Sequence, residues 1–84
     1  MKLIFSDHAW DDYLYWQHTD RKILRRINAL IKETMRHPFE GMGKPERLKH
    51  ALSGYWSRRI TDEHRFVYRI EEDALQIAQL RYHY

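Results

Sequence analysis

Residues 55–70 read YWSRRITDEHRFVYRI, and this stretch decides the fold because its apolar residues recur at every second position on either side of a polar centre. A period of two is typical of β-strands with one buried face. The centre, residues 62–64, predicts a three-residue hairpin loop between strands at 55–61 and 65–70. A two-residue loop would mix apolar and charged residues on each face. The predicted core face holds Trp56, Ile60, Phe66, Tyr68 and Ile70, and the opposite face holds Ser57, Arg59, Arg65 and Arg69.

Outward from this hairpin, residues 74–82 predict a further strand that completes an antiparallel meander. Leu75 and Ile77 share their parity with Gln79, as expected of a central strand covered in part on both faces. At the other end of the chain, residues 2–5 form a short apolar run of β-prone residues.

Two helices are predicted between the N-terminal run and the hairpin. Ser6 offers a side-chain oxygen as the cap of a helix that begins at Asp7. A second helix follows a cap at Thr19 or Asp20 and should end before Pro38. Apolar residues at helical spacing predict its buried stripe: Ile23, Leu24, Ile27, Leu30, Ile31 and Thr34.

Residues 37–47 hold both prolines and two of the three glycines, which predicts a loop rather than a linker between domains. At 84 residues the chain has room for a single domain, expected to span residues 1–84. We therefore predict an α+β domain, with two N-terminal helices packed on one face of a small, mostly antiparallel sheet.

Composition narrows the class of protein. The chain contains no cysteine, which excludes a disulfide framework and a thiolate metal site. The apolar run at residues 1–5 is too short for a signal peptide or a membrane span, so we expect a cytoplasmic protein without membrane contact. The net charge is only +3, but residues 44–69 carry seven Lys and Arg against three Asp and Glu. Such a local excess favours a polyanionic partner.

Glu46 is a candidate general base for cleaving RNA. Without a metal, that reaction needs a base for the ribose 2′-hydroxyl, cations for the charge that grows on the phosphate, and an acid for the departing 5′-oxygen. Glu46 lies among Lys44, Arg47 and Lys49, where a phosphodiester would be attracted. The alternative is a solvated loop glutamate, and the same cations weaken a carboxylate as a base.

Arg59 and Arg65 are the candidate phosphate ligands, because guanidinium groups on neighbouring strands match the non-bridging phosphate oxygens. A solvated face paired with Asp62 and Glu63 is the alternative. Lys49 is a weaker candidate of the same kind.

His83 is the candidate general acid, since imidazole titrates near neutrality. A frayed terminus is the ordinary expectation for a penultimate residue. Tyr82 and Tyr84 argue against fraying because they give the terminus apolar area with which to dock. Tyr84 can also stack on an RNA base.

No metal site or other cofactor is predicted. His8 and Asp12 lie four residues apart on the first helix, but no convergent third ligand follows in sequence. The basic residues of the second helix predict a solvated amphipathic surface, with contact to ribosomal RNA as the second interpretation.

Five short stretches resemble the YoeB branch of the RelE-like toxins of type II toxin–antitoxin systems, and the resemblance covers the whole chain. They are WDDYLYWQ (10–17), GKPE (43–46), WSRRI (56–60), EHR (63–65) and RYHY (81–84).

The resemblance implies a RelE-like, microbial-RNase-like fold and an mRNA interferase. This is a metal-independent endoribonuclease that cuts mRNA in the A site of the ribosome and so inhibits translation. It also implies inhibition by a YefM-like antitoxin, and it leaves a homodimer open.

The resemblance also implies roles for the candidate residues. It makes Glu46 the general base, His83 the general acid and Arg65 the cation that stabilises the phosphate.

Lys49 and Arg59 would hold substrate and leaving-group charge, and Tyr84 would orient the nucleotide at the cleavage site. Arg47 departs from the family pattern, which has proline there, and this puts the stiffness of the loop in doubt rather than the chemistry.

Two other functions stay open at this point. The first is a non-catalytic RNA-binding or antitoxin-binding module, which would tolerate the loss of the Glu46 carboxylate. The second is a toxin fold degraded into a structural partner, which would cause no growth arrest.

Overall fold

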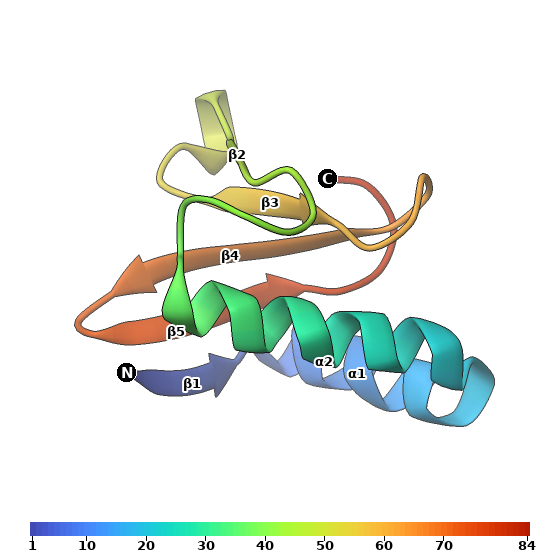
Figure 1. Cartoon of the computed structure of the whole chain (residues 1–84). Helices are drawn as coiled ribbons and strands as arrows, with labels where there is room; N and C mark the ends of the chain where they lie inside the picture. Colours follow the sequence, from blue (N-terminus) through green and yellow to red (C-terminus); the bar gives the residue numbers. More distant parts are fainter.

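The computed structural model describes residues 1–84 and consists of a five-stranded sheet with two helices against one of its faces (Figure 1). The strand order is β1-β5-β4-β3-β2, with β1 parallel to β5 and every other neighbouring pair antiparallel. This confirms the predicted α+β class and the mostly antiparallel sheet. The elements are β1 (Lys2–Phe5), α1 (Asp7–Thr19), α2 (Arg21–Arg36), β2 (Glu46–Arg47), the 3-10 turn η1 (His50–Leu52), β3 (Trp56–Arg59), β4 (Arg65–Glu71) and β5 (Ala74–Gln79).

Both helices begin at side-chain caps. The Ser6 hydroxyl accepts a hydrogen bond from the amide of Ala9 at 3.0 Å, as predicted. The Asp20 carboxylate accepts from two amides of the first turn of α2, so Asp20 rather than Thr19 is the second cap. The second helix stops ahead of Pro38, also as predicted.

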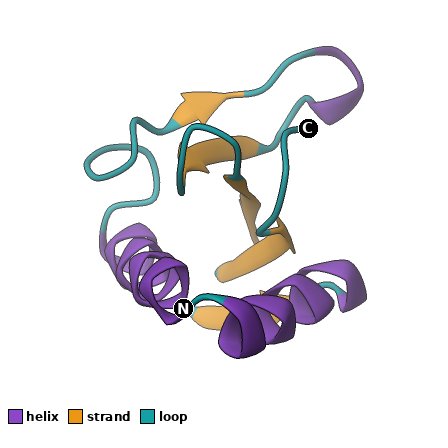
Figure 2. Cartoon of the chain, turned by 90° about the vertical axis from the view of Figure 1, so that its right-hand side faces the viewer, coloured by secondary structure: helices purple, strands orange, loops and turns teal.

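The core lies between the two helices and the face of the sheet that they cover (Figure 2). The apolar stripe of α2 points into it, with Ile27 and Leu30 fully buried. From the sheet come Phe66, Tyr68 and Leu75, all fully buried as well. The opposite face of the sheet is left free of helices, and the alternation of side chains along β3 and β4 directs the polar residues there.

The hairpin between β3 and β4 differs from the prediction. Its last strand pair is Arg59 with Arg65, so five residues, 60–64, form the loop, and the predicted three-residue loop is wrong. The register is shifted by two residues, which preserves the predicted faces. Thr61 explains the wider loop, because its side chain accepts hydrogen bonds from the amides of Glu63 and His64.

Two further boundaries were predicted wrongly. The strand predicted over 74–82 ends at Gln79, because α1 side chains hold the next residue, Leu80, and beyond it only the Tyr82 carbonyl oxygen bonds the backbone of β4. The predicted loop at 37–47 ends earlier than expected, because β2 pairs with β3 and places Glu46 opposite Ser57. This pairing involves residues on the far side of the intervening turn η1, so no local pattern indicates it.

Arg58 is fully buried on the core side of β3, and no pattern in the sequence predicts this burial. Its guanidinium donates to the carbonyl oxygens of His37, of Glu40 at 3.0 Å and of Met42 at 2.9 Å. No carboxylate pairs with it. Arg58 therefore ties the segment that leads to β2 onto the sheet through that segment's own backbone.

Tyr68 completes this connection from β4. Its hydroxyl donates to the carbonyl oxygen of Pro38 at 2.6 Å and accepts from the Arg58 Nε at 3.2 Å. Burial raises the pKa of Tyr68 above 10.0, against the opposing effect of the hydrogen bond and charge of Arg58. Further along the segment, the Arg59 amide donates to the carbonyl oxygen of Gly43 at 2.7 Å.

Candidate active site

A cavity of about 220 Å³ opens where β2, β3 and the start of β4 meet the C-terminal tail. It receives side chains from the helix-free face of the sheet, because Glu46, Ser57, Arg59 and Arg65 share that parity. Its lining residues are Lys44, Glu46, Ser57, Arg59, Arg65, His83 and Tyr84.

The structure brings five of the six predicted site residues into this one cavity. The sixth, Lys49, lines a neighbouring cavity of about 440 Å³ that shares Glu46 and Tyr84 with the first. The two cavities are therefore adjacent.

Glu46 is exposed and forms no ion pair, although three cationic side chains line the same cavity. Its place in β2, opposite Ser57, gives the carboxylate a defined position on the sheet edge. A carboxylate without an ion-pair partner can accept a proton from a bound molecule.

Arg65 is only 8% exposed, although the sequence pattern predicted an exposed polar face. Its Nη1 donates to the carbonyl oxygens of Thr61 at 2.6 Å, Asp62 at 3.0 Å and His64 at 3.1 Å. Its other two nitrogens donate to no protein atom, and the side chain lines the cavity. The hairpin loop thus orients the guanidinium without neutralising its charge.

Arg59 is exposed at the end of β3 and makes no ion pair with Asp62 or Glu63. Arg59 is thus solvated as the alternative expects, but the expected pairing with Asp62 and Glu63 is not formed. Its backbone carbonyl oxygen accepts from the Arg26 Nη2 of α2 at 3.1 Å, which joins the end of β3 to the helix layer.

The C-terminal tail returns from β5 past the start of β4, where the Arg65 amide donates to the Tyr82 carbonyl oxygen at 3.0 Å. The next two residues, His83 and Tyr84, reach the cavity. None of the five other histidines lines it. The imidazole of His83 forms no hydrogen bond or ion pair with the protein, which leaves both ring nitrogens free.

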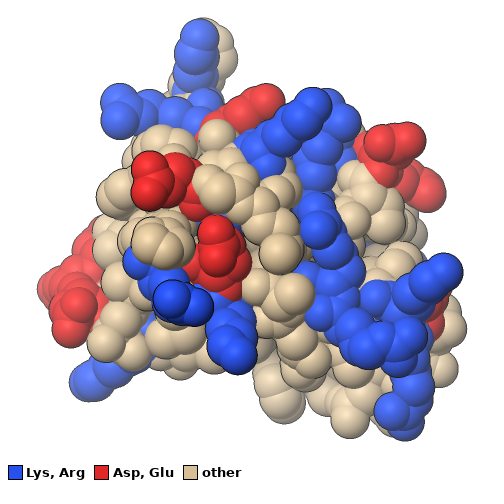
Figure 3. Space-filling model, in the orientation of Figure 1, with Lys and Arg blue, Asp and Glu red and all other residues tan.

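Positive charge extends beyond the cavity. Figure 3 shows Lys and Arg side chains in a band that rises from the right-hand part of α2 toward the strands above it. The second helix supplies exposed or half-exposed cations along most of its length: Arg21, Lys22, Arg25, Arg26, Lys32 and Arg36. Such a band suits a large polyanion.

No three His, Asp or Glu side chains come close enough together to hold a metal ion. Neither helix has the length and apolar character that crossing a membrane requires.

Two lining residues were not singled out as site candidates from the sequence. Ser57 shares its parity with Arg59, so the alternating pattern could have placed it in the site. Lys44 also lines the cavity. Its backbone has a positive φ of 51° directly after Gly43, and no sequence pattern indicates that turn.

Comparison with known proteins agrees with the resemblance seen in the sequence. Residues 5–84 match the family described as the YoeB-like toxin of bacterial type II toxin–antitoxin systems. Toxin YoeB of Escherichia coli K12 is 67% identical, and that of Streptomyces coelicolor 56% identical, each over 100% of both chains.

Solved structures agree with this assignment. The YoeB/ParE toxin from Agrobacterium tumefaciens has a TM-score of 0.98 and 52% identity, with 100% of both chains covered. The YoeB–YefM heterotetramer from Staphylococcus aureus contains a chain with a TM-score of 0.91 and 46% identity, covering 100% of this chain and 98% of that one. The chain therefore belongs to the family of YoeB-like toxins of bacterial type II toxin–antitoxin systems.

Proposed function

We propose that this toxin is a metal-independent endoribonuclease that cleaves mRNA in the A site of the ribosome. The observation that carries the proposal is the convergence of Glu46, Arg65 and His83 in one cavity. These residues lie far apart in the chain, on β2, β4 and the tail. Together they offer the base, the cation and the acid that a transesterification of RNA requires.

In the proposed reaction, Glu46 takes the proton from a ribose 2′-hydroxyl, and the oxygen attacks the adjacent phosphorus. Negative charge grows on the non-bridging oxygens, where Arg65 stabilises it. His83 donates a proton to the departing 5′-oxygen as its bond to phosphorus breaks. The products are a 2′,3′-cyclic phosphate on one fragment and a 5′-hydroxyl on the other.

The contacts of Arg65 favour this role. Three loop carbonyls hold its Nη1, so the guanidinium need not reorganise when charge develops beside it. Carbonyl oxygens leave its full positive charge in place, whereas a carboxylate partner would cancel it.

Arg59 lines the same cavity as Glu46, and Lys49 lines the neighbouring cavity that Glu46 also borders, so both add positive charge near the Glu46 carboxylate. We assign them to holding the RNA backbone and the charge of the leaving group. Tyr84 lines both cavities, which suits a ring that orients the nucleotide by stacking. A bound phosphodiester also offsets the cations around Glu46 that would otherwise weaken it as a base.

The partner in the resting state is, we propose, a YefM-like antitoxin. The support is that a relative from S. aureus was solved as a YoeB–YefM complex, and also as a YoeB dimer. A homodimer is accordingly part of the proposal. The ribosome and its mRNA are the partners in the active state, and the basic band over α2 is compatible with a nucleic-acid surface.

The test is to add purified protein to translating ribosomes and map the 5′ ends of the mRNA fragments. Cleavage at A-site codons is expected for the wild type and its loss for Glu46→Gln, which removes the base while preserving size. Glu72→Gln is the matched control, because Glu72 is exposed in the turn between β4 and β5, outside the cavity. Equal cleavage by Glu46→Gln and wild type would overturn the base assignment, and absence of any cleavage would favour a binding module.

A further inference from the structure

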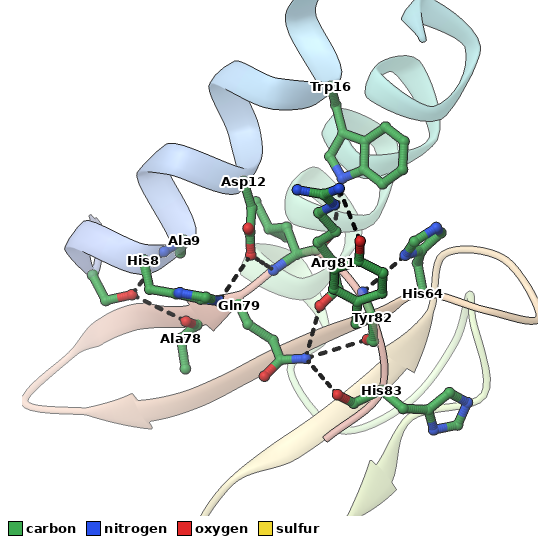
Figure 4. A network of polar contacts seen from close by, with 12 residues as sticks. His8, Ala9, Asp12, Trp16, His64, Ala78, Gln79, Arg81, Tyr82 and His83 are labelled. Carbon is green, nitrogen blue, oxygen red and sulfur yellow. Dashed lines mark hydrogen bonds and ion pairs between the residues drawn. The ribbon is translucent and has the colours of Figure 1, made fainter. Parts of the chain in front are cut away.

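The tail that carries His83 lies beyond the end of β5 and is held mainly by side chains (Figure 4). At Leu80, α1 engages both backbone groups. The Asp12 carboxylate accepts from the Leu80 amide at 3.0 Å, and the Trp16 indole N–H donates to the Leu80 carbonyl oxygen at 2.9 Å. Each of these two α1 side chains is buried.

Two residues further on, both backbone groups of Tyr82 are also hydrogen-bonded, one to a side chain at the end of the β3–β4 loop and the other to the backbone at the start of β4. The Nδ1 atom of His64 accepts from the Tyr82 amide at 2.8 Å, and the Arg65 amide donates to the Tyr82 carbonyl oxygen at 3.0 Å. Tyr82 has a φ of 63°, in the left-handed region, so the chain turns there toward His83 and the cavity. His64 is the acceptor of the Tyr82 amide at this turn, while the Gln79 Nε2 donates to carbonyl oxygens of the tail, those of Arg81, Tyr82 and His83.

His64 is only 8% exposed and does not line the cavity. Its ring makes a T-shaped contact with Trp16, with centroids 4.8 Å apart, and packs at a tilt against Tyr82, with centroids 5.5 Å apart. Since Nδ1 accepts, the ring hydrogen must sit on Nε2, where the nearest acidic group is the Glu63 carboxylate at 3.9 Å. The only hydrogen bond of this buried imidazole is therefore the one that it accepts from the Tyr82 amide.

We propose that His64 is a positioning residue, which sets where His83 delivers its proton by accepting the Tyr82 N–H. The inference rests on the proposed role of His83 as general acid. His64 does not touch the RNA. Without its Nδ1 the Tyr82 amide loses its acceptor, the turn at Tyr82 loosens, and His83 leaves the line of the departing oxygen.

A positioning role and a packing role of His64 predict different effects on cleavage. A packing role for His64 would depend on its volume and would impair every step that needs a folded site. A positioning role depends on one acceptor atom and impairs only the step that uses His83. Variants and substrates can address these two dependences independently.

The test uses His64→Leu and His64→Asn, two side chains with the same branched shape and the same number of heavy atoms. Asn can place its carbonyl oxygen where Nδ1 lies, whereas Leu offers no acceptor. In single-turnover cleavage on ribosomes programmed with one mRNA, we expect His64→Leu to be slower than wild type by about tenfold or more. His64→Asn should recover most of that loss.

A second substrate supplies a readout that packing would not move. In an mRNA whose scissile linkage carries a bridging 5′-sulfur, the thiolate leaves without needing an acid. His64→Leu should then cleave nearly as fast as wild type, and so should His83→Gln, while Glu46→Gln stays slow.

The outcomes are distinct. His64→Leu at wild-type rate on ordinary mRNA, or equally slow on both substrates, would overturn the positioning role. Equal deficits in His64→Leu and His64→Asn would overturn it too. His83→Gln at wild-type rate on ordinary mRNA would instead overturn the acid assignment itself, and the present proposal with it.

Discussion

Arg58 and Arg65 both bond backbone carbonyl oxygens rather than carboxylates, one on each face of the same hairpin. A guanidinium has five N–H donors in a rigid fork, so one side chain can bridge several carbonyls of an irregular segment. Arg58 does this for the segment before β2, and Arg65 for the β3–β4 loop. Their charge stays unneutralised, which matters at Arg65 because the cavity is beside it.

Arg65→Ala should therefore abolish cleavage and also destabilise the protein, by about 1–3 kcal/mol, because three loop carbonyls lose their buried donor. Its position on the polar face alone would have predicted little loss of stability. Chemical denaturation together with single-turnover cleavage measures both effects. Arg59→Ala is the control, since that side chain is exposed and should change cleavage but not stability. An unchanged unfolding free energy in Arg65→Ala would contradict the loop-holding role.

Tyr68 should make the free energy of unfolding decrease at alkaline pH. Its pKa is raised in the folded protein, so the unfolded chain releases this proton first as the pH passes about 10. The stability due to the neutral phenol is complete below that pH and is lost as the pH rises through the folded pKa. Tyr68→Phe should be less stable near neutrality by about 1–3 kcal/mol, since Pro38 and Arg58 lose a partner.

The measurement is the free energy of unfolding of wild type and Tyr68→Phe across the alkaline range. Every other titrating group is common to the two proteins, so the difference between them isolates Tyr68. That difference should shrink above about pH 10. A constant difference would show that the phenol does not titrate with folding.

At the scale of elements, the local patterns predicted what depends on neighbouring residues. Ser6 predicted the start of α1, and the cap and Pro38 predicted both ends of α2 to within about a residue, because caps and breakers act on adjacent turns. The face parity of β3 and β4 also held. The wrong boundaries of β5 and β2 depend on distant partners, such as the hydrogen bond of Asp12 to Leu80 at the end of β5, whereas the wrong hairpin loop depends on the local hydrogen bonds of Thr61.

The segment before β2 owes its path to Gly43, which offers a direct test of how Glu46 is placed. Gly43 has a φ of 83°, and an added Cβ would lie 2.9 Å from the Leu30 Cδ2 and 3.1 Å from the Arg58 Cβ. Gly43→Ala should cost roughly 1–2 kcal/mol from the left-handed backbone, with roughly 1–3 kcal/mol more from the clash. We expect it to slow cleavage as well, because Lys44 and Glu46 follow directly.

Gly54→Ala is the matched control, since its φ is 96° but an added Cβ would meet nothing within 4 Å. It should show the backbone cost alone and keep its cleavage rate. Thermal melts and single-turnover rates of the two variants make the comparison. Equal stability losses would show that the contacts of Gly43 with α2 and β3 are not tight.

For the whole molecule, the layered arrangement explains why the cavity forms. The helices cover one face of the sheet and leave the other to polar residues, while β2 and the tail close the cavity at the end of β3. The sequence supplied the candidates Glu46, Arg65 and His83 but not their convergence, which depends on the loop closed by Arg58 and on the tail clamped by α1. Only the family resemblance implied that these three residues act together in one site.

The most direct test of the mechanism is single-turnover cleavage of one programmed mRNA in two forms. One is all-ribose, and the other has a single 2′-deoxy nucleotide immediately 5′ to the mapped scissile phosphate. Transesterification by the RNA's own hydroxyl predicts that the all-ribose mRNA yields a 2′,3′-cyclic phosphate and that the 2′-deoxy mRNA stays intact. Cleavage of the two forms at the same rate would contradict it.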